Sequence, residues 1–533
     1  MVEPAPYLQK LRILRRFTPA ALVLLLLLVQ LLFTANAPWV GDYWEHRAVL
    51  DELINNPGNP SHPLLLSDKP HAFFSPYLVA LGWAGSYTHL TAAQLLGIAA
   101  VLNLLLFLVS IRLLAGLLLP SGNRQLQFAA LLVAVLCCWG YDPPNFSSFY
   151  HLGTFFYTTP YPSTFSFVLS VPAAACVRYL LYHSLSFPIR LFLAGLVIFL
   201  LTTILLTHPL TFLFAVSLLV AVAVQAVRDQ TTSLFRITVS GLGFIILPFA
   251  LASFWPYYPF YELLTYVEAG NRFHTDSREL YSSLYFKLLP LAVLVLFTVP
   301  KPFRFINNHL PVLLALLFLA LLFFYGFFSG SFGFGRMIAF MALLSQVLLV
   351  TLLLKEQSVS RKRIVAGWLI LTCLPFAVTS IPQVLRSATT THSRYLARPV
   401  HQPFELTDPS ELAHRLLFLE KQVPKGALVF CDTTCARYLP GLGMRVVATG
   451  TPLYWIPDYE QRLKDAWLFF YSGTPSERDS LLQKYQPDYL LLTPATRHLL
   501  PQINRWTSKE RVHEENGLVL VPLKFSAPGQ TND

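Results

Sequence analysis

The chain has 533 residues, of which 54% are hydrophobic and 13% are charged, and its formal net charge is +11. Soluble proteins of this length are far less apolar, so the composition indicates a polytopic membrane protein. The excess of Lys and Arg does not indicate a nucleic-acid partner. The basic residues fall in short clusters between apolar runs, which is the pattern of a topology signal.

The N-terminal stretch carries a basic cluster, from Lys10 to Arg16, and then an apolar run from 17 to about 35. This run is too long for the apolar segment of a signal peptide, and many similar runs follow. We therefore expect an uncleaved first helix with a cytoplasmic N-terminus. Ten more runs of spanning length lie at about 92–119, 126–141, 163–183, 189–207, 209–227, 234–253, 284–300, 310–329, 336–354 and 363–381.

The distribution of basic residues orients these eleven spans. Loops predicted to be inside hold most of the Lys and Arg, as in the last of them with Lys355, Arg361, Lys362 and Arg363, whereas the outside loops hold few. We predict a mostly α fold, in which residues 1–382 form a polytopic transmembrane helical bundle with the N-terminus in and the C-terminus out. Its first external loop, 36–91, is long.

The start of that loop, "GDYWEH" at 41–46, holds two carboxylates and an imidazole beside an apolar span. If the stretch is helical, Asp42, Glu45 and His46 share one face. A carboxylate near an apolar boundary has its pKa raised by desolvation and can then accept a proton from a hydroxyl, so these three are the candidate catalytic residues. The alternative is a helix N-terminus decorated with acids, which the helix dipole favours.

The rest of the first loop reads as a Pro/Asn-rich turn region, 55–63, followed by an apolar segment interrupted by Pro76 and glycines. That segment is predicted to be an interfacial helix rather than a span. His62 and His71 are further imidazoles of this loop.

Several outside residues suit a lipid phosphate or a sugar. Arg336 follows a Gly-rich turn and is the first candidate cation for a phosphate, with Lys69 and Arg272 as alternatives. His208 lies at a short turn between spans, and Tyr161 ends a loop crowded with aromatics that would stack on sugar rings. Each has a plainer interpretation, because Arg, Tyr and Trp also collect at any membrane interface.

The tail differs in composition from the membrane part. Residues 383–403 are predicted to be a linker, and 404–533 a small extracytoplasmic α/β domain with a mostly parallel sheet. Helix starts with capping-box patterns occur at Asp408 and Thr474, and strand-like runs at 427–431, 445–449, 488–493 and 518–523. The sequence leaves open whether Cys431 and Cys435 form a disulfide.

The order of these parts resembles the GT-C class of integral-membrane glycosyltransferases, near the protein-mannosyltransferase and aminoarabinose-transferase families. The resemblance rests on "GDYWEH", "FFSPY", "YPSTF", "THP", "FGFGR" and "LLQKYQPDYLLLTP". It implies a polyprenyl-phosphate sugar donor, inverting transfer and Asp42 as general base. The usual acidic motif of that class has two carboxylates adjacent or one residue apart, whereas Asp42 and Glu45 are three apart.

We therefore predict a bacterial inner-membrane, multi-pass glycosyltransferase with a periplasmic or extracellular tail, acting on a glycan, lipid or protein acceptor. The alternatives are a transporter of lipid-linked glycans, which would need polar helices at mid-membrane, and a non-catalytic scaffold that retains the fold. The sequence assigns no cofactor with certainty. A divalent metal is possible, since two acids and a histidine could hold one, but it is not favoured, because no second cluster of ligands accompanies the acids.

Overall fold

The computed structural model describes residues 6–265, 277–295, 302–391, 409–451, 453–507 and 512–525. The chain divides into two compact units. The first unit comprises Met1–Ala35 and Gly97–Thr389, and the second comprises Asn36–Leu96 and Thr390–Asp533. The sequence analysis assigned the first external loop to the membrane module, whereas its contacts group it with the tail.

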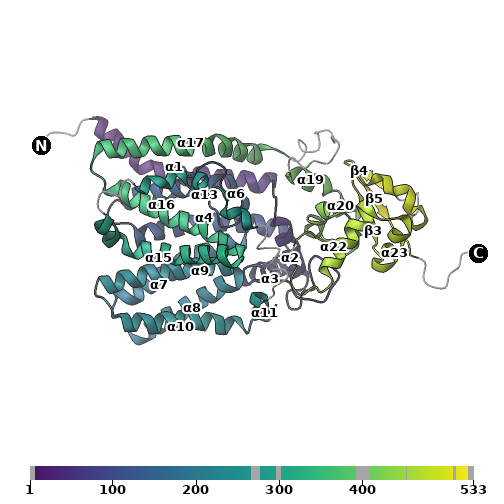
Figure 1. Ribbon diagram of the computed structural model, residues 1–533, viewed down its shortest axis with the longest axis horizontal. Coiled ribbons are helices and arrows are strands. Elements are labelled where there is room, and N and C mark those ends of the chain that lie inside the picture. Colours follow the sequence, from purple (N-terminus) through teal and green to yellow (C-terminus); the bar gives the residue numbers. More distant parts are fainter. Residues whose placement is uncertain are drawn as a thin grey trace, which may run out of the picture. The chain divides into compact units, whose positions relative to one another are not determined.

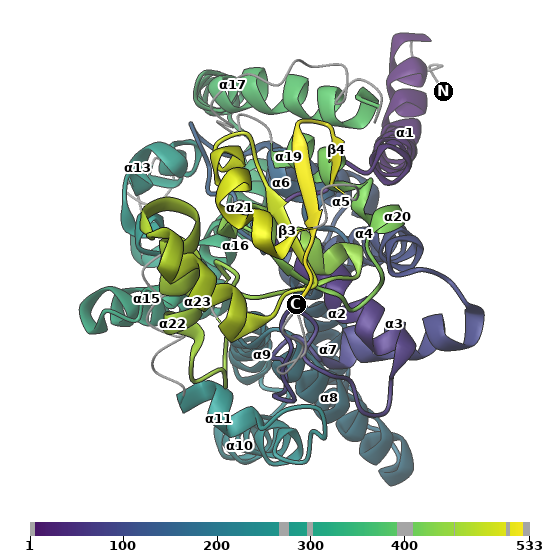
Figure 2. The ribbon, with the colours of Figure 1, turned by 90° about the vertical axis from the view of Figure 1, so that its right-hand side faces the viewer.

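The first unit is helical. It contains α1 (Pro6–Asn36), α4 (Ala92–Leu118), α5 (Arg124–Cys137), α6 (Leu152–Thr158), α7 (Pro162–Tyr182), α8 (Phe187–Thr207), α9 (Pro209–Arg228), α10 (Leu234–Ala252), α11 (Phe260–Thr265), η1 (Ser277–Tyr281), α13 (Leu284–Lys287), η2 (Leu289–Leu294), α15 (Pro302–Ser329), η3 (Phe332–Arg336), α16 (Met337–Lys355) and α17 (Val359–Thr389). Helices α7, α8, α9 and α10 pack against one another (Figures 1 and 2).

The described residues contain eight helices long and apolar enough to cross a membrane, so the chain is a multi-pass membrane protein. Two of the eleven expected spans, 126–141 and 234–253, correspond to the shorter apolar helices Arg124–Cys137 and Thr238–Ala252. The expected span at 284–300 is wrong over its described part, which forms the short helices α13 and η2. Pro290 lies at the start of η2, where its ring is incompatible with a continuing α-helix.

Two other boundaries differ from expectation. Helix α17 continues through Pro375 and Pro382 to Thr389, so the first seven residues of the predicted linker are helical. The apolar segment after Pro76 forms α3 (Pro76–Thr88), a helix of 13 residues that is too short to span, as expected. Ser75 caps it by accepting a hydrogen bond from the Leu78 N–H.

Buried polar side chains line the contacts between four elements of the first unit, and we call them the polar seam. They are Gln30, Asn103, Thr158, Thr159, Ser163, Thr164, Ser166 and Ser170. The Thr159 hydroxyl donates to Gln30 Oε1 at 2.9 Å, and Asn103 Nδ2 donates to the Thr159 carbonyl at 2.8 Å. These bonds join α1, α4 and the α6–α7 turn.

The second unit combines the first external loop with the tail. The loop supplies α2 (Tyr43–Asn55) and α3. The tail supplies α19 (Pro409–Leu416), α20 (Leu419–Gln422), β1 (Leu428–Phe430), α21 (Thr433–Ala436), η4 (Leu439–Leu442), β2 (Arg445–Val446), α22 (Tyr459–Trp467), η5 (Leu468–Ser472), α23 (Pro475–Tyr485), β3 (Tyr489–Leu492), η6 (Arg497–Trp506), β4 (His513–Glu515) and β5 (Leu518–Pro522).

The five strands form one sheet in the order β2-β1-β3-β5-β4. The first three strands in this order are parallel, and β5 pairs antiparallel with both β3 and β4. Four of the strands lie within the runs predicted from the sequence. Strand β4 was missed because its His-Glu-Glu sequence has no apolar residue. The capping box at Thr474 is present, with Glu477 as its partner, at the start of α23.

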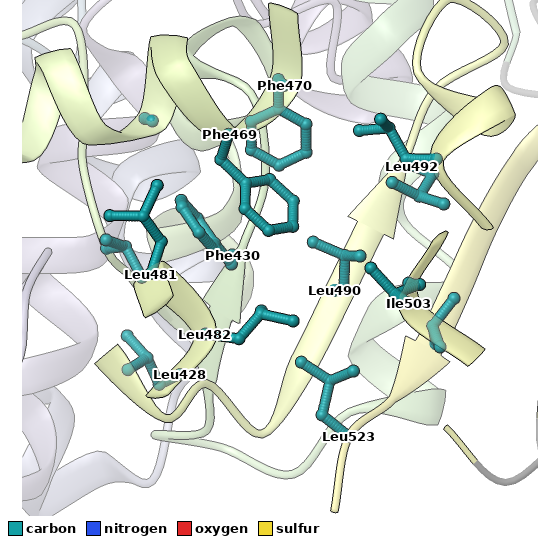
Figure 3. Packing of buried hydrophobic residues seen from close by; sticks show 14 of the residues in the cluster. Leu428, Phe430, Phe469, Phe470, Leu481, Leu482, Leu490, Leu492, Ile503 and Leu523 are labelled. Carbon is teal, nitrogen blue, oxygen red and sulfur yellow. The ribbon is translucent and has the colours of Figure 1, made fainter. Parts of the chain in front are cut away.

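One face of the sheet is covered by apolar side chains from α22, η5, α23 and η6. Figure 3 shows Phe430 of β1 beside Phe469 and Phe470 of η5, and the ring centroids of Phe430 and Phe469 are 4.6 Å apart. Leu482 and Leu490 continue this layer (Figure 3). The cysteines Cys431 and Cys435 are free and buried, so they form no disulfide in the structure.

The loop and the tail are joined by close packing between α2 and η4. An added Cβ at Gly441 of η4 would lie 2.7 Å from the Trp44 carbonyl oxygen and 3.2 Å from its Cα. The Val446 N–H donates to the Leu64 carbonyl at 2.9 Å, which extends the hydrogen bonding of β2 into the loop. Arg445 pairs with Glu52, and both side chains are largely shielded from solvent. These contacts make the loop part of the same compact unit as the tail.

We expect Gly441→Ala to destabilise this junction by about 1–3 kcal/mol, because the new methyl group would overlap backbone atoms that cannot move aside. Hydrogen exchange of the α2 amides in the full-length protein measures the change, as faster exchange in the variant. Gly450→Ala is the matched control, because an added Cβ there meets nothing within 4 Å. Equal exchange in both variants would contradict the packing argument.

Candidate active site

The candidate site lies at the start of α2. Gly41 has φ +64°, a conformation that favours glycine, and it turns the chain into the helix. Trp39 and Tyr43 stack with ring centroids 4.7 Å apart, and Trp44 Nε1 donates to the Trp39 carbonyl at 3.2 Å. These aromatic contacts define where the helix begins and therefore where the acidic residues lie.

Asp42 precedes the helix at its N-cap position, yet its carboxylate makes no capping hydrogen bond. Instead Oδ1 lies 3.3 Å from Nη2 of Arg437, and the two side chains are 47% and 49% exposed. Sequence reasoning missed Arg437, because it is 395 residues away and follows the short helix α21 of the tail. The buried carboxylate that was expected at Asp42 is instead found at Glu45.

Glu45 is the buried carboxylate. Its Oε1 lies 3.4 Å from Nε2 of His71, which is also buried. The Phe73 N–H donates to His71 Nδ1 at 3.2 Å, so a neutral His71 carries its hydrogen on Nε2 and directs it at Glu45. Burial raises the pKa of Glu45, and the hydrogen bond from His71 offsets only part of this effect.

Two other imidazoles of the loop are buried and shifted toward their neutral forms. His46 packs on Phe73 with ring centroids 4.9 Å apart, and burial lowers the pKa of His46 to about 4. The Leu64 and Leu65 N–H groups both donate to His62 Nδ1, and burial lowers the pKa of His62 to about 2. Both rings are therefore uncharged at neutral pH.

These residues do not form a metal centre of the usual kind. Among the described residues, no group of three or more His, Cys, Asp and Glu is arranged to hold a metal ion. The Asp42 carboxylate faces a guanidinium. The buried acid Glu45 pairs with an imidazole whose other nitrogen already accepts a backbone hydrogen bond.

The structure gives each of the other described candidate residues its own local surroundings. Lys69 belongs to the second unit and is exposed. Arg336, at the end of η3 in the first unit, donates from Nη1 to the Ser147 hydroxyl at 3.2 Å and lies over the Phe146 ring at 5.1 Å. Arg272 lies outside the described residues.

His208 and Tyr161 have local structural roles in the first unit. His208 is the N-cap of α9, where its Nδ1 accepts a hydrogen bond from the Thr211 N–H at 3.2 Å. Tyr161 is the buried N-cap residue of α7, and its carbonyl accepts from the Thr164 N–H at 3.1 Å. A contact of either residue with substrate stays a prediction.

Known proteins are similar to this chain only in structure, since no protein-family model and no curated protein matches it. The apo oligosaccharyltransferase of Archaeoglobus fulgidus has a TM-score of 0.47 and 12% identity, over 92% of this chain and 73% of that chain. The same enzyme with an inhibitory peptide and a dolichol-phosphate has a TM-score of 0.48 and 13% identity, over 96% and 75%. The proposals below rest on the residues of this chain.

We expect Glu45→Gln to stabilise the second unit at high pH. A carboxyl whose pKa is raised by folding contributes stability below its unfolded pKa and loses it as pH rises through the folded pKa. The Gln side chain stays neutral, and its carbonyl can still accept from His71. Thermal unfolding at pH 8 should therefore show a higher midpoint for the variant than for the wild type, and the difference should vanish toward pH 4.

Asp465→Asn provides a control with the opposite sign. Burial alone would raise the pKa of Asp465, but hydrogen bonds from Lys484 and Tyr485 outweigh it and lower that pKa. Asp465→Asn should therefore lower the unfolding midpoint at pH 8, with a smaller loss toward low pH. The same pH response in both variants would contradict the assignment of Glu45 as a carboxyl held toward its neutral form.

Proposed function

We propose that this protein is a membrane glycosyltransferase that moves a sugar from a polyprenyl-phosphate donor to an acceptor on the outer face of a bacterial inner membrane, with Asp42 as general base. The observation that carries the proposal is the exposed Asp42 carboxylate beside the buried Glu45 carboxyl, at the start of α2. Placing the tail on the outer face is part of the same proposal.

The proposed reaction is a single displacement. The acceptor oxygen forms a bond to the anomeric carbon while the bond from that carbon to the phosphate oxygen breaks. The electron pair of the broken bond stays on the phosphate, and the acceptor proton passes to the Asp42 carboxylate. Attack from the side opposite the leaving phosphate inverts the anomeric configuration.

The environment separates the roles of the two acids. Asp42 is half exposed and can meet an acceptor hydroxyl. Glu45 is buried, and its raised pKa favours its protonated form. The negative charge of Asp42 is one of the influences that raise the pKa of Glu45, after burial. Two carboxyls whose environments differ in this way suit different roles in one site. We assign proton acceptance to Asp42. The buried side chains of Glu45 and His46 are proposed to stabilise the loop around it.

The phosphate would need a cation as it leaves, and Arg336, Lys69 and Arg272 remain candidates from the sequence. Arg336 is the best supported of the three, because Ser147 and Phe146 hold its guanidinium. His208 and Tyr161 stay as weaker proposals for substrate contact, His208 because its side chain caps α9 and Tyr161 because it is buried at the start of α7.

The polar seam favours one alternative, a transporter of lipid-linked glycans, because such a protein needs polar groups between its spans. The residues of the seam carry no ionisable group, and hydrogen bonds such as Thr159 to Gln30 join neighbouring helices. Interhelical bonds of this kind are expected in any packed membrane bundle. We therefore prefer the enzyme, and a flipping assay with labelled lipid tests the transporter directly.

The first substrates to test are a dolichyl-phosphate-linked sugar with a panel of glycan, lipid and peptide acceptors. Solved structures similar to this chain include a complex with dolichol-phosphate and one tethered with an acceptor peptide containing the NVT sequon. A third is a complex with Zn and sulfate, so each reaction is run with and without added divalent cation.

We expect Asp42→Asn to reduce the rate of sugar transfer by about 10²–10⁴-fold, the usual contribution of a general base. The measurement is turnover by purified full-length protein. Glu514→Gln is the matched control, because Glu514 is also a half-exposed carboxylate of the second unit paired with an arginine, and it should leave turnover unchanged.

Three other outcomes are informative. Turnover that survives in Asp42→Asn but is lost in Glu45→Gln would assign the base to Glu45. Turnover that survives in both variants would remove the acids from the mechanism. Lipid flipping by a wild-type protein that transfers no sugar would support the transporter instead.

A further inference from the structure

We propose that Arg437 of the tail receives the donor phosphate as it leaves, and that it exchanges its Asp42 partner for that phosphate when the donor binds. This inference rests on the proposed function and deepens it. It gives the tail a binding role in the site. The argument depends on contacts within the second unit alone.

Arg437 is held in place by the segment on both sides of it. Asp432 caps α21 by accepting hydrogen bonds from the Thr434 and Cys435 N–H groups, and Arg437 follows the last residue of that helix. The next residue, Tyr438, packs edge-on against Trp44 of α2 with ring centroids 5.8 Å apart. With Gly441 closely packed on Trp44, this segment holds the backbone of Arg437 near Asp42, so its side chain can reach the carboxylate.

The pair between Arg437 and Asp42 has the properties of an exchangeable contact. It joins one guanidinium nitrogen to one carboxylate oxygen at 3.3 Å, and both side chains are half exposed. An exposed ion pair contributes little stability, so changing partners costs little. A phosphate offers several acceptor oxygens and binds the planar guanidinium in bidentate fashion, which a single carboxylate oxygen does not.

The other ion pairs between the first loop and the tail are different. Arg445 and Glu52 are 13% and 12% exposed, which is the burial of a structural pair. Lys425 with Asp51, and Arg47 with Glu420, lie further along α2 and involve no candidate catalytic residue. Among the described ion pairs between the first loop and the tail, the pair of Arg437 and Asp42 is therefore the one that is half exposed and also contains a proposed catalytic residue.

The charges of the reaction favour the exchange. Breaking the bond to the sugar leaves one more negative charge on the lipid phosphate, while the proton from the acceptor neutralises Asp42. With Arg437 already on the phosphate, its positive charge offsets the negative charge that the phosphate gains in this step. Moving the guanidinium to the phosphate when the donor binds also frees the Asp42 carboxylate oxygen to accept a hydrogen bond from the acceptor hydroxyl.

The test is binding of dolichyl phosphate to purified full-length protein in nanodiscs, which requires no turnover. We expect Arg437→Gln to weaken binding at least tenfold, Arg437→Lys to restore part of it, and Asp42→Asn to strengthen it, because the guanidinium loses its competing carboxylate. Arg497→Gln is the matched control, since Arg497 is a half-exposed arginine of the tail paired with Glu514. It should bind like the wild type.

If the pair of Arg437 and Asp42 is purely structural, a different result is expected. Arg437→Gln and Asp42→Asn would then alter stability alike and leave the binding of dolichyl phosphate unchanged. That result would overturn the inference, and loss of sugar transfer in Asp42→Asn would still leave the proposed function standing. Conversely, binding that depends on Arg437 in a protein without transferase activity would keep the phosphate site and remove the enzyme.

Two further ligands identify what Arg437 recognises. Dolichol without phosphate should show no dependence on Arg437. Inorganic phosphate should compete with dolichyl phosphate only weakly if the lipid chain contributes to binding. Equal affinity for free phosphate and the lipid would assign the site to phosphate itself, and Arg437-dependent binding of dolichol would contradict the proposal.

Discussion

The close approach of η4 to the start of α2 is the contact on which the rest of the second unit depends. It requires a glycine at 441, because any side chain there would overlap the backbone of Trp44. Once the two segments meet, Tyr438 packs on Trp44 and the Arg437 guanidinium reaches Asp42. A single residue without a side chain thus brings together groups that are 395 positions apart in the chain.

Local features of the sequence predicted much of the fold. Apolar length identified the long helices, the Thr474 and Glu477 pattern predicted the start of α23, and apolar runs located four of the five strands. The failures have local causes as well. A proline interrupts the segment after Leu284, and the polar strand β4 is ordered only by pairing with β5. Hydrophobic periodicity contains no information about either effect.

The candidate site was only partly predictable. Asp42, Glu45 and His46 were expected on one helix face, but the helix begins at Tyr43, so Asp42 lies before it and remains exposed while the other two are buried. The buried Glu45 pairs with His71, which lies later in the same loop. No spacing rule reports such tertiary contacts, and the same holds for the pairing of Asp42 with Arg437.

Burial also determines which charges act at the surface of the second unit. The pKa of Glu45 is raised by its burial, and the pKa values of His46 and His62 are lowered by theirs, so all three groups are shifted toward neutral forms. The exposed pair of Asp42 and Arg437 is then left as the ionic contact at the start of α2 in the described structure. A substrate phosphate and an acceptor hydroxyl need a cation and a base, respectively. In the proposed mechanism the loop supplies the base and the tail supplies the cation, so neither segment could perform this chemistry without the other.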